Sequence, residues 1–288
     1  MKKIKGKIAA ITGAGSGIGQ ALAVQLAKMG CHLAIADIHE QGLESTKNLT
    51  QKYNVKVSTH ILNVASKEAV YAFTEEVVHF HERVNILINN AGVSMIAKVE
   101  QTEYEDFEWL MNINFWGVVY GTKAFLPLLR KAGEGHIVNV SSLFGLLGVP
   151  NQSAYNASKF AVRGFTESLR MELEMYGENI SATCVHPGGV KTNIITNSRI
   201  KTQSGIFKVK EKAVNSFEKT TFTTAEQAAT KIILGIKQNR RRVLIGKDAF
   251  MGDAFQRLFP ERYQKNVVKR SRLAFVDKDV CGAHGEFI

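Results

Sequence analysis

Seven short runs rich in β-branched residues alternate along this chain with six longer amphipathic stretches, and this alternation constrains the fold more than any other feature. Such runs predict buried strands, and apolar residues at helical spacing predict helices. We expect strands at residues 7–12, 32–36, 57–62, 84–89, 136–141, 180–186 and 242–245, and helices at 18–29, 41–53, 66–81, 103–130, 153–176 and 224–237. Parallel strands joined by right-handed crossover helices follow from that order. The pattern therefore predicts a doubly wound α/β fold, with a seven-stranded parallel sheet and helices on both faces.

Three of the predicted helices carry recognisable start signals. Ser66 can cap the helix that follows it, because its hydroxyl can accept from a free backbone N–H of the first turn. Thr102 with Glu105, and Thr224 with Gln227, have the spacing of capping boxes.

The composition fits one large globular domain, or one domain with an appendage, since the 288 residues are 45% hydrophobic and 22% charged. We expect residues 1–247 to form the main domain and residues 248–288 an extension. Cys31, Cys184 and Cys281 are far apart and odd in number, and no Cys/His cluster accompanies them, so we predict neither disulfides nor a metal site. No signal peptide and no apolar run of 18 residues is present, which predicts a cytoplasmic protein.

The net charge of +11 is concentrated in the last third of the chain. Residues 1–198 hold 18 basic and 17 acidic side chains, whereas residues 199–288 hold 19 and 9. Such an excess can attract nucleic acid or an anionic membrane. No nucleic-acid-binding motif accompanies it, so we expect no nucleic acid partner.

Two segments fall outside the alternation. Residues 188–223 form a long polar connection, which predicts a functional lid. The extension predicts one basic amphipathic helix, and its apolar residues are Phe250, Met251, Ala254, Phe255, Leu258 and Phe259, opposed by Asp253, Gln256, Arg257 and Arg262. This helix could make weak peripheral contact with a membrane, cover a substrate pocket, or pack against the domain or another subunit.

A glycine-rich turn follows the first predicted strand and opens the first helix. Gly13, Gly17 and Gly19 let the backbone turn sharply and approach a pyrophosphate, and Ser16 and Ile18 stand where the helix N-terminus presents free N–H groups. Asp37 follows at the end of the second strand, where a carboxylate can accept hydrogen bonds from ribose hydroxyls and repel a 2′-phosphate. No cation adjoins this aspartate. The turn therefore predicts a dinucleotide site that prefers NAD to NADP.

A second motif points to proton transfer. Tyr155 and Lys159 are four residues apart on a predicted helix, so their side chains share one face, and Ser142 precedes them after a strand. A free phenol has a pKa of ~10, and lowering that pKa to about 7 requires roughly 4 kcal/mol of stabilisation of the phenolate. A unit charge at ~4 Å in an effective dielectric of ~20 supplies about that much. We therefore expect Lys159 to lower the pKa of Tyr155.

Together these residues resemble the short-chain dehydrogenase/reductase family over residues 5–246. The resemblance rests on Thr12-Gly-Ala-Gly-Ser-Gly-Ile-Gly19, Asn89-Asn-Ala-Gly92, Asn114 in Asn-Phe-Trp-Gly117, Ser142 in Val-Ser-Ser, Tyr155-Asn-Ala-Ser-Lys159 and Pro187-Gly-Gly-Val-Lys-Thr192. It implies a Rossmann-like domain that transfers a hydride between NAD(H) and an alcohol, aldehyde or ketone.

The resemblance also implies the role of each catalytic residue. Tyr155 would be the general acid/base, and Lys159 would lower its pKa and hold the nicotinamide ribose. Ser142 would stabilise the substrate oxygen, and Asn114 would support a water that links Lys159 to solvent.

The remaining cofactor contacts are implied in the same way. Thr192 and the backbone of Val190 would meet the nicotinamide carboxamide, and Asn89 would lie under the adenosine ribose. Asn63 stands where the family usually has an aspartate, and its amide oxygen can still accept from the adenine amino group. The other implied cofactor-binding residues are Val64, Asn90, Ala91, Gly92 and Pro187.

The segments expected to line the substrate pocket are residues 93–96, residues 143–151 and the residues from Gly188 onward. The first two are apolar, and the second offers Leu143, Phe144, Leu146, Leu147 and Val149 and no fixed cation. They favour a lipophilic substrate. They could instead pack beneath the lid or between subunits, and we expect a homodimer or homotetramer. We interpret His136 and His186 as structural. NADP preference, dehydration or epimerisation, and a non-catalytic NAD-sensing module remain alternatives, although a sensor needs neither Tyr155 nor Ser142.

Overall fold

The computed structural model describes residues 1–201 and 221–275, in which strands and helices alternate as predicted. The strands are β1 (Ile8–Thr12), β2 (His32–Asp37), β3 (Val57–Ile61), β4 (Ile86–Asn89), β5 (Met95–Ile96), β6 (Gly135–Val140), β7 (Ile180–Pro187), β8 (Arg199–Ile200) and β9 (Arg242–Ile245). The α-helices are α1 (Gly17–Lys28), α2 (Glu40–Thr50), α3 (Lys67–His81), α4 (Tyr104–Met111), α5 (Gly117–Lys131), α6 (Ser153–Met175), α8 (Ala225–Lys237), α9 (Lys247–Leu258) and α10 (Arg262–Phe275). Short 3-10 turns are η1 (Gln51–Tyr53), η2 (Val99–Gln101) and η4 (Leu143–Gly145), and η3 (Asn112–Trp116) is a π-helix.

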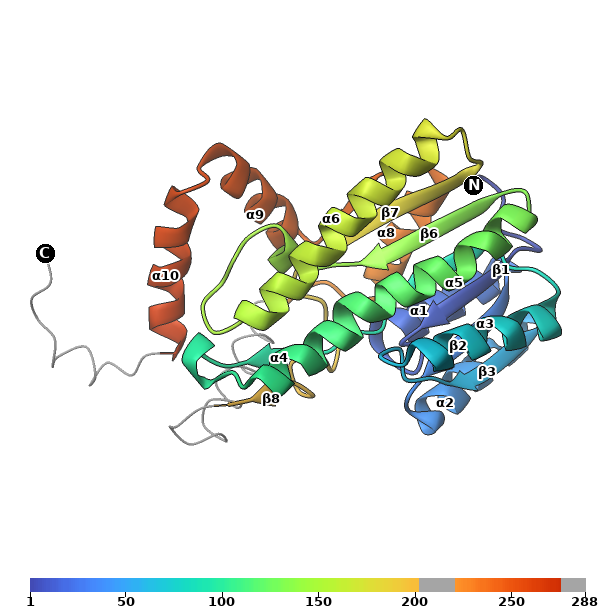
Figure 1. Cartoon of the computed structure of the whole chain (residues 1–288), viewed down its shortest axis with the longest axis horizontal. Coiled ribbons are helices and arrows are strands. Elements are labelled where there is room, and N and C mark those ends of the chain that lie inside the picture. The colour runs from blue at the N-terminus through green and yellow to red at the C-terminus, as the bar shows by residue number, and fades with distance from the viewer. Residues whose placement is uncertain (202–220, 276–288) are drawn as a thin grey trace, which may run out of the picture.

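All seven strands of the main sheet are parallel, in the order β3-β2-β1-β4-β6-β7-β9 (Figure 1). The predicted doubly wound fold is therefore confirmed. Strand order reverses between β1 and β4, and in such sheets ligands bind at the carboxyl ends of the strands beside that point. A second sheet, of β5 and β8, was not predicted because each strand has only two residues.

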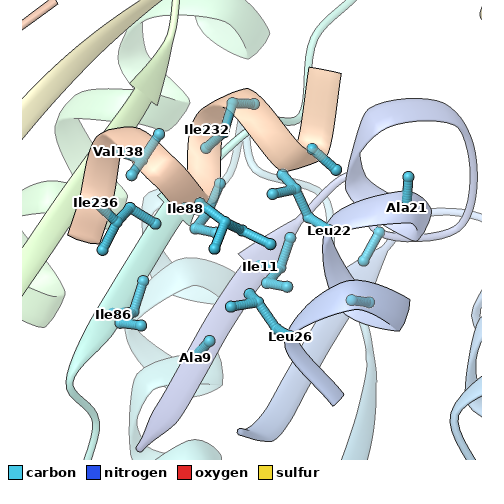
Figure 2. Packing of buried hydrophobic residues seen from close by; sticks show 14 of the residues in the cluster. Ala9, Ile11, Ala21, Leu22, Leu26, Ile86, Ile88, Val138, Ile232 and Ile236 are labelled. Carbon is cyan, nitrogen blue, oxygen red and sulfur yellow. The ribbon is translucent and has the colours of Figure 1, made fainter. Parts of the chain in front are cut away.

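Both faces of the sheet are covered by helices, as Figure 1 shows. On one face, Leu22 and Leu26 of α1 and Ile232 and Ile236 of α8 pack onto strand residues such as Ile11 (Figure 2). All are fully buried, and each contributes roughly 1.5–3 kcal/mol on transfer from water. On the other face, side chains of α3, α5 and α6 form a second core around β4 and β6. This packing fixes the strand ends that carry the candidate site.

The predicted helix 103–130 differs from the structure in two ways. It is divided into α4 and α5 by the π-helix Asn112–Trp116, which inserts extra backbone into an otherwise apolar periodic stretch. The Thr102 capping box is also wrong, because the Thr102 hydroxyl donates to the Lys98 carbonyl (2.9 Å) and Glu103 holds the N-cap position without a side-chain bond. The Ser66 cap and the Thr224 capping box are confirmed.

The described residues of the extension, up to Phe275, form two helices, α9 and α10, rather than the single one predicted. α9 starts directly after β9 and meets the loop beyond β6 so closely that a Cβ at Gly252 would lie 2.8 Å from the Leu143 side chain. Of the predicted lid, residues 202–220 lie outside the described part of the chain.

Candidate active site

The glycine-rich turn lies between β1 and α1, with Gly13 at φ 65° and Gly17 at φ 54°, a region that side chains with a Cβ rarely adopt. A Cβ at Gly13 would also lie 2.8 Å from the Ala91 backbone. Asn90 holds the turn, because its side-chain amide donates to the carbonyls of Thr12 and Gly13 at 3.0 Å each. Ser16 is the N-cap of α1 and makes no side-chain bond to the helix, so the first-turn N–H groups can receive an anion.

Asp37 ends β2 beside this turn. One carboxylate oxygen accepts from the Gly15 N–H (2.9 Å) and the other from the His39 N–H (3.0 Å). Thr192, far from this turn in the sequence, lies beside it in the fold, since a Cβ at Gly17 would be 3.0 Å from the Thr192 methyl group. The structure thus brings together the two ends of the predicted cofactor site. A glycine turn without side chains to obstruct a ligand, next to free backbone N–H groups, fits a dinucleotide.

The structure also positions the other predicted cofactor residues. Asn63 is exposed, and its amide oxygen accepts from the Ala65 N–H (3.0 Å). Val64 is buried against Gly117, where a Cβ would lie 3.0 Å away. Ala91 donates its N–H to the Thr12 hydroxyl (3.2 Å), and Pro187 ends β7.

Asn89 differs from the expectation that it lies under a ribose. Its side chain is buried beneath α5, where Nδ2 donates to Asn139 Oδ1 (2.8 Å) and to Thr122 Oγ1 (3.3 Å). Because alternate residues of a strand face opposite sides of the sheet, Asn89 crosslinks β4 and β6 rather than facing the glycine turn.

Tyr155 and Lys159 lie near the start of α6 and are almost fully buried, at 7% and 3% exposure. The Lys159 ammonium is 5.6 Å from the centre of the Tyr155 ring and donates to the Val140 carbonyl (3.1 Å). Phe144 packs edge-on against the phenol at 6.2 Å between ring centres. Ser142, after β6, lies beside the phenol, where its hydroxyl favours the charged form and so lowers the Tyr155 pKa. The three predicted side chains therefore lie together, with Tyr155 and Lys159 buried and Ser142 half-buried.

The electrostatics of this pair differ from the sequence-based expectation. Burial raises the pKa of Tyr155 to about 12, and the hydrogen bond from Ser142 only partly opposes this. Burial likewise lowers the pKa of Lys159 to about 8. The predicted lowering of the phenol pKa by Lys159 is thus outweighed in the protein alone, because desolvation penalises both charged forms.

Asn114 lies inside the π-helix and is fully buried. Its amide pairs with the backbone of Val93, accepting from the N–H (2.8 Å) and donating to the carbonyl (2.9 Å), and also donates to Ser158 (3.2 Å). A Cβ at Gly92 would lie 3.2 Å from the Asn114 oxygen and 3.3 Å from the Lys159 ammonium. Asn114 and Lys159 therefore meet across Gly92, where only a glycine leaves both side chains unobstructed.

Two positioning residues were missed or undervalued by sequence reasoning. Asn156, inside the Tyr155–Lys159 motif, donates to the carbonyls of Phe144 (2.8 Å) and Leu147 (3.0 Å) and so fixes the loop after Ser142. His186 is buried, and its Nδ1–H donates to the Ser142 carbonyl (2.9 Å). Its spacing from Ser142 gave no sequence signal, because only strand pairing brings the ends of β6 and β7 together. His136 is buried and bonds to Thr183 at 2.8 Å, as expected of a structural residue.

The extension packs against the loops that follow β6 and β7, next to the site. Leu143 and Leu147 pack against Gly252 of α9, and the Gly148 N–H donates to the Tyr263 hydroxyl of α10 (3.3 Å). Asp248, in the first turn of α9, accepts from the Gly189 N–H (2.6 Å). Val190 is buried and bridges to Thr223.

Comparison with known proteins gives consistent matches. Residues 7–203 match the family model described as short chain dehydrogenase. The SadH protein of Mycobacterium tuberculosis is 42% identical over 268 residues, which cover 93% of this chain and 96% of SadH. Human estradiol 17-beta-dehydrogenase 11 is 32% identical over 270 residues, which cover 93% of this chain and 84% of that protein.

The fold also matches solved structures. A short-chain dehydrogenase/reductase from Burkholderia phymatum, crystallised in complex with NAD, superposes with a TM-score of 0.84 at 26% identity. The superposition covers 92% of this chain and 97% of that chain.

Proposed function

The chain belongs to the short-chain dehydrogenase/reductase family of oxidoreductases, and from that premise we propose that it transfers a hydride between NAD(H) and a hydrophobic alcohol, aldehyde or ketone. One observation carries the proposal. Tyr155, Lys159 and Ser142 lie together at the carboxyl end of the sheet, where Tyr155 and Lys159 are buried, beside the glycine turn and Asp37. General acid/base chemistry needs a titratable group and an oxygen-stabilising donor in one such place.

Each residue has a defined task in the proposed reaction. Tyr155 gives its phenolic proton to the substrate oxygen in reduction and takes a proton from the substrate hydroxyl in oxidation. Ser142 donates a hydrogen bond to the same oxygen and stabilises the charge that develops there. His186 and Asn156 hold the backbone around Ser142 in position. The bound NAD would supply the hydride acceptor or donor and, when oxidised, a positively charged ring.

Lys159 supplies only part of the free energy needed to lower the pKa of Tyr155. Bringing the Tyr155 pKa from about 12 to near 7 requires roughly 7 kcal/mol, at about 1.36 kcal/mol per pH unit. A unit charge 5.6 Å from the centre of the Tyr155 ring, where the Lys159 ammonium lies, supplies about 3 kcal/mol in an effective dielectric of ~20. Lys159 therefore provides less than half of what oxidation needs. The protonated phenol, in contrast, is already in the form that reduction uses.

Tyr155→Phe tests this mechanism. The change removes only the hydroxyl, so turnover should fall by at least about a thousandfold, while NADH binding, measured by fluorescence titration, stays within twofold. Tyr120→Phe is the matched control, because this tyrosine stacks on Trp116 away from the site. Full turnover by Tyr155→Phe would overturn the mechanism. Wild-type protein that binds NADH but turns over no alcohol would favour a sensing module. Turnover of the substrate without reduction of NAD would favour dehydration or epimerisation.

NAD rather than NADP is the proposed cofactor. Asp37 supports this, because its carboxylate at the glycine turn would repel a 2′-phosphate. The NAD complex of the Burkholderia relative adds support. Replacing Asp37 with Ala and Ser16 with Arg should shift the ratio of catalytic efficiencies toward NADP by about tenfold or more. An unchanged ratio would make the assignment wrong.

A lipophilic substrate is proposed from the walls of the site. Phe144 packs on Tyr155, and Leu143 and Leu147 line the contact with α9. The name of the human relative specifies a steroid alcohol, which is consistent with such a pocket. Aliphatic alcohols of increasing length, assayed with NAD, should show rising kcat/KM at about fourfold per methylene buried. A preference for short or charged alcohols would contradict the proposal.

We also propose that the protein forms a homodimer or homotetramer. Phe160, Met171 and Met175 are exposed along one stripe of α6, and apolar surface on one helix face can serve as a subunit contact. Light scattering after gel filtration gives the molar mass, and Met171→Glu should lower it. A monomeric wild type would remove this proposal.

A further inference from the structure

α9 is an amphipathic helix whose apolar face points away from the rest of the protein and whose small and polar face packs against it. The face that packs inward is small and polar: Ala249 is buried, Gly252 meets Leu143, and Asp253 pairs with Arg242 at 3.4 Å. The outward face is apolar, and the exposed fractions are 54% for Phe250, 70% for Met251, 36% for Phe255 and 72% for Leu258. A helix with one apolar face normally buries that face.

The exposed side chains form one patch, which we call the α9 patch: Phe250, Met251, Phe255, Leu258 and Phe259. Phe259, the residue after the helix, is 41% exposed, and its ring lies 5.5 Å from that of Phe255. Contiguous apolar surface of this kind marks a binding surface.

A basic helix, α10, is separated from the last residue of the patch by two residues. α10 carries Arg262, Lys265, Lys269, Arg270 and Arg272, and no acidic residue lies within its bounds. All five basic residues are exposed. The inward side of α10 is a line of partly buried residues that includes Tyr263 and Val267. Figure 1 shows α9 and α10 together at one end of the molecule, beyond the sheet.

Charge decides among the surfaces that could cover this end. A two-fold contact with a second copy would place two basic α10 helices close together, and like charges oppose such a contact. A nucleic acid would neutralise α10 but leave the α9 patch exposed to water. An anionic lipid surface satisfies both helices, because apolar side chains enter the acyl boundary while basic side chains meet the headgroups. No described helix is long and apolar enough to cross a membrane, so the contact would be peripheral.

We propose that the α9 patch and the basic face of α10 form a docking surface for an anionic membrane. Because α9 also packs on Leu143 and Leu147, the docked face would lie next to the substrate end of the site. Binding itself requires no catalytic activity. The docking proposal therefore stands or fails independently of the proposed reaction.

The test is co-sedimentation of the full chain with extruded vesicles, either of phosphatidylcholine alone or with one third phosphatidylserine. We expect binding to the anionic vesicles at least about tenfold stronger than to the neutral ones. High salt should weaken it without abolishing it, because the apolar contribution is not screened. Wild-type protein that stays in the supernatant with anionic vesicles would overturn the proposal.

Two double variants separate the contributions of the helices. Met251→Glu with Leu258→Glu removes apolar insertion, and Lys265→Glu with Lys269→Glu reverses charge; each should weaken binding at least about tenfold. Lys52→Glu with Lys67→Glu is the control, because it changes net charge equally at exposed sites on η1 and α3. Thermal melts and turnover of all variants should match the wild type.

Three other outcomes would overturn the proposal. If the control weakened vesicle binding as much as the α10 variant does, the binding would depend on net charge alone and not on this surface. Unchanged binding by the α9 variant would leave only electrostatic adsorption. A lower molar mass of the α9 variant in light scattering, with no vesicle binding by the wild type, would assign the patch to a second copy of the chain.

Discussion

Lys159→Met should make the cofactor-free protein more stable while abolishing its turnover. The lysine is 3% exposed, and its ammonium donates a hydrogen bond to the Val140 carbonyl. Burial lowers its pKa from 10.5 to about 8, so at neutral pH the fold holds a desolvated positive charge. Methionine has a similar length and no charge.

The magnitude follows from the pKa. The difference between 10.5 and about 8 corresponds to a penalty of about 3 kcal/mol on the folded, charged state at 1.36 kcal/mol per pH unit. Losing the bond to Val140 costs about 1–2 kcal/mol, because a buried carbonyl is left without that donor. The net gain for Lys159→Met is therefore about 2 kcal/mol at pH 7.

The sign of the pH dependence is fixed by the direction of the shift. Below pH 8 both the folded and the unfolded wild type hold the proton, so the full penalty is present. Between pH 8 and 10.5 the folded state releases the proton while the unfolded state keeps it, and wild-type stability rises with pH. The advantage of the variant should thus shrink toward zero by about pH 9.5.

Urea unfolding at pH 7.0 and 9.5 without cofactor, followed by circular dichroism, measures both effects. Lys231→Met, at an exposed position on α8, is the control and should change the unfolding free energy by less than about 0.5 kcal/mol. A Lys159→Met protein that is less stable than the wild type at pH 7, or a difference that does not vary with pH, would refute the reasoning. Confirmation would mean that the site is maintained at a cost in stability.

Four further substitutions test packing and burial. Phe125→Ala removes a fully buried ring between α5 and the sheet and should lower the unfolding free energy by about 3–5 kcal/mol in urea titrations; a loss below about 1 kcal/mol would contradict the described core. Gly145→Ala would place a Cβ 2.6 Å from a backbone carbonyl of α6 and should reduce both melting temperature and turnover, whereas Gly164→Ala, with open space around it, should stabilise α6 by about 0.5–1 kcal/mol. Burial lowers the pKa of His136 to about 3 and of His186 to about 4, so the unfolded state binds more protons below pH 6.5 and each histidine should remove about 2 kcal/mol of stability between pH 7 and 5. His136→Gln should remove its share of that acid sensitivity, and an unchanged slope of stability against pH would show that this histidine is not buried in its neutral form.

The fold could be predicted because its strands and helices are long enough for their periodicity to register. Seven strands of at least four residues were found, whereas β5 and β8, of two residues each, pair through tertiary contacts that leave no local pattern. The π-helix was missed because its residues continue the apolar spacing of their neighbours. Thr102 had a capping sequence, but its hydroxyl instead closes the preceding 3-10 turn at Lys98.

The site was predictable in its residue types and less so in its energetics. Tyr155 and Lys159 share a helix face, so their proximity followed from spacing, and Asp37 reached the glycine turn through the strand order. The sequence could not indicate how completely the pair is buried, and burial reverses the expected direction of the phenol pKa. The orientation of α9 was equally hidden, because periodicity defines a face without saying where it points.

The π-helix makes residues 112–116 more sensitive to chain length than to side-chain identity. Substituting Asn114 would remove one amide from its pairing with Val93 and leave the surrounding backbone in phase. Deleting any one residue of the segment would restore an unbroken α-helix, but each residue advances a helix by about 100°, so α4 would rotate by that angle relative to α5. Leu110 or Phe125 would then leave its core. Natural variation within this segment should therefore consist of substitutions, with insertions and deletions confined to the turns on either side of the two helices.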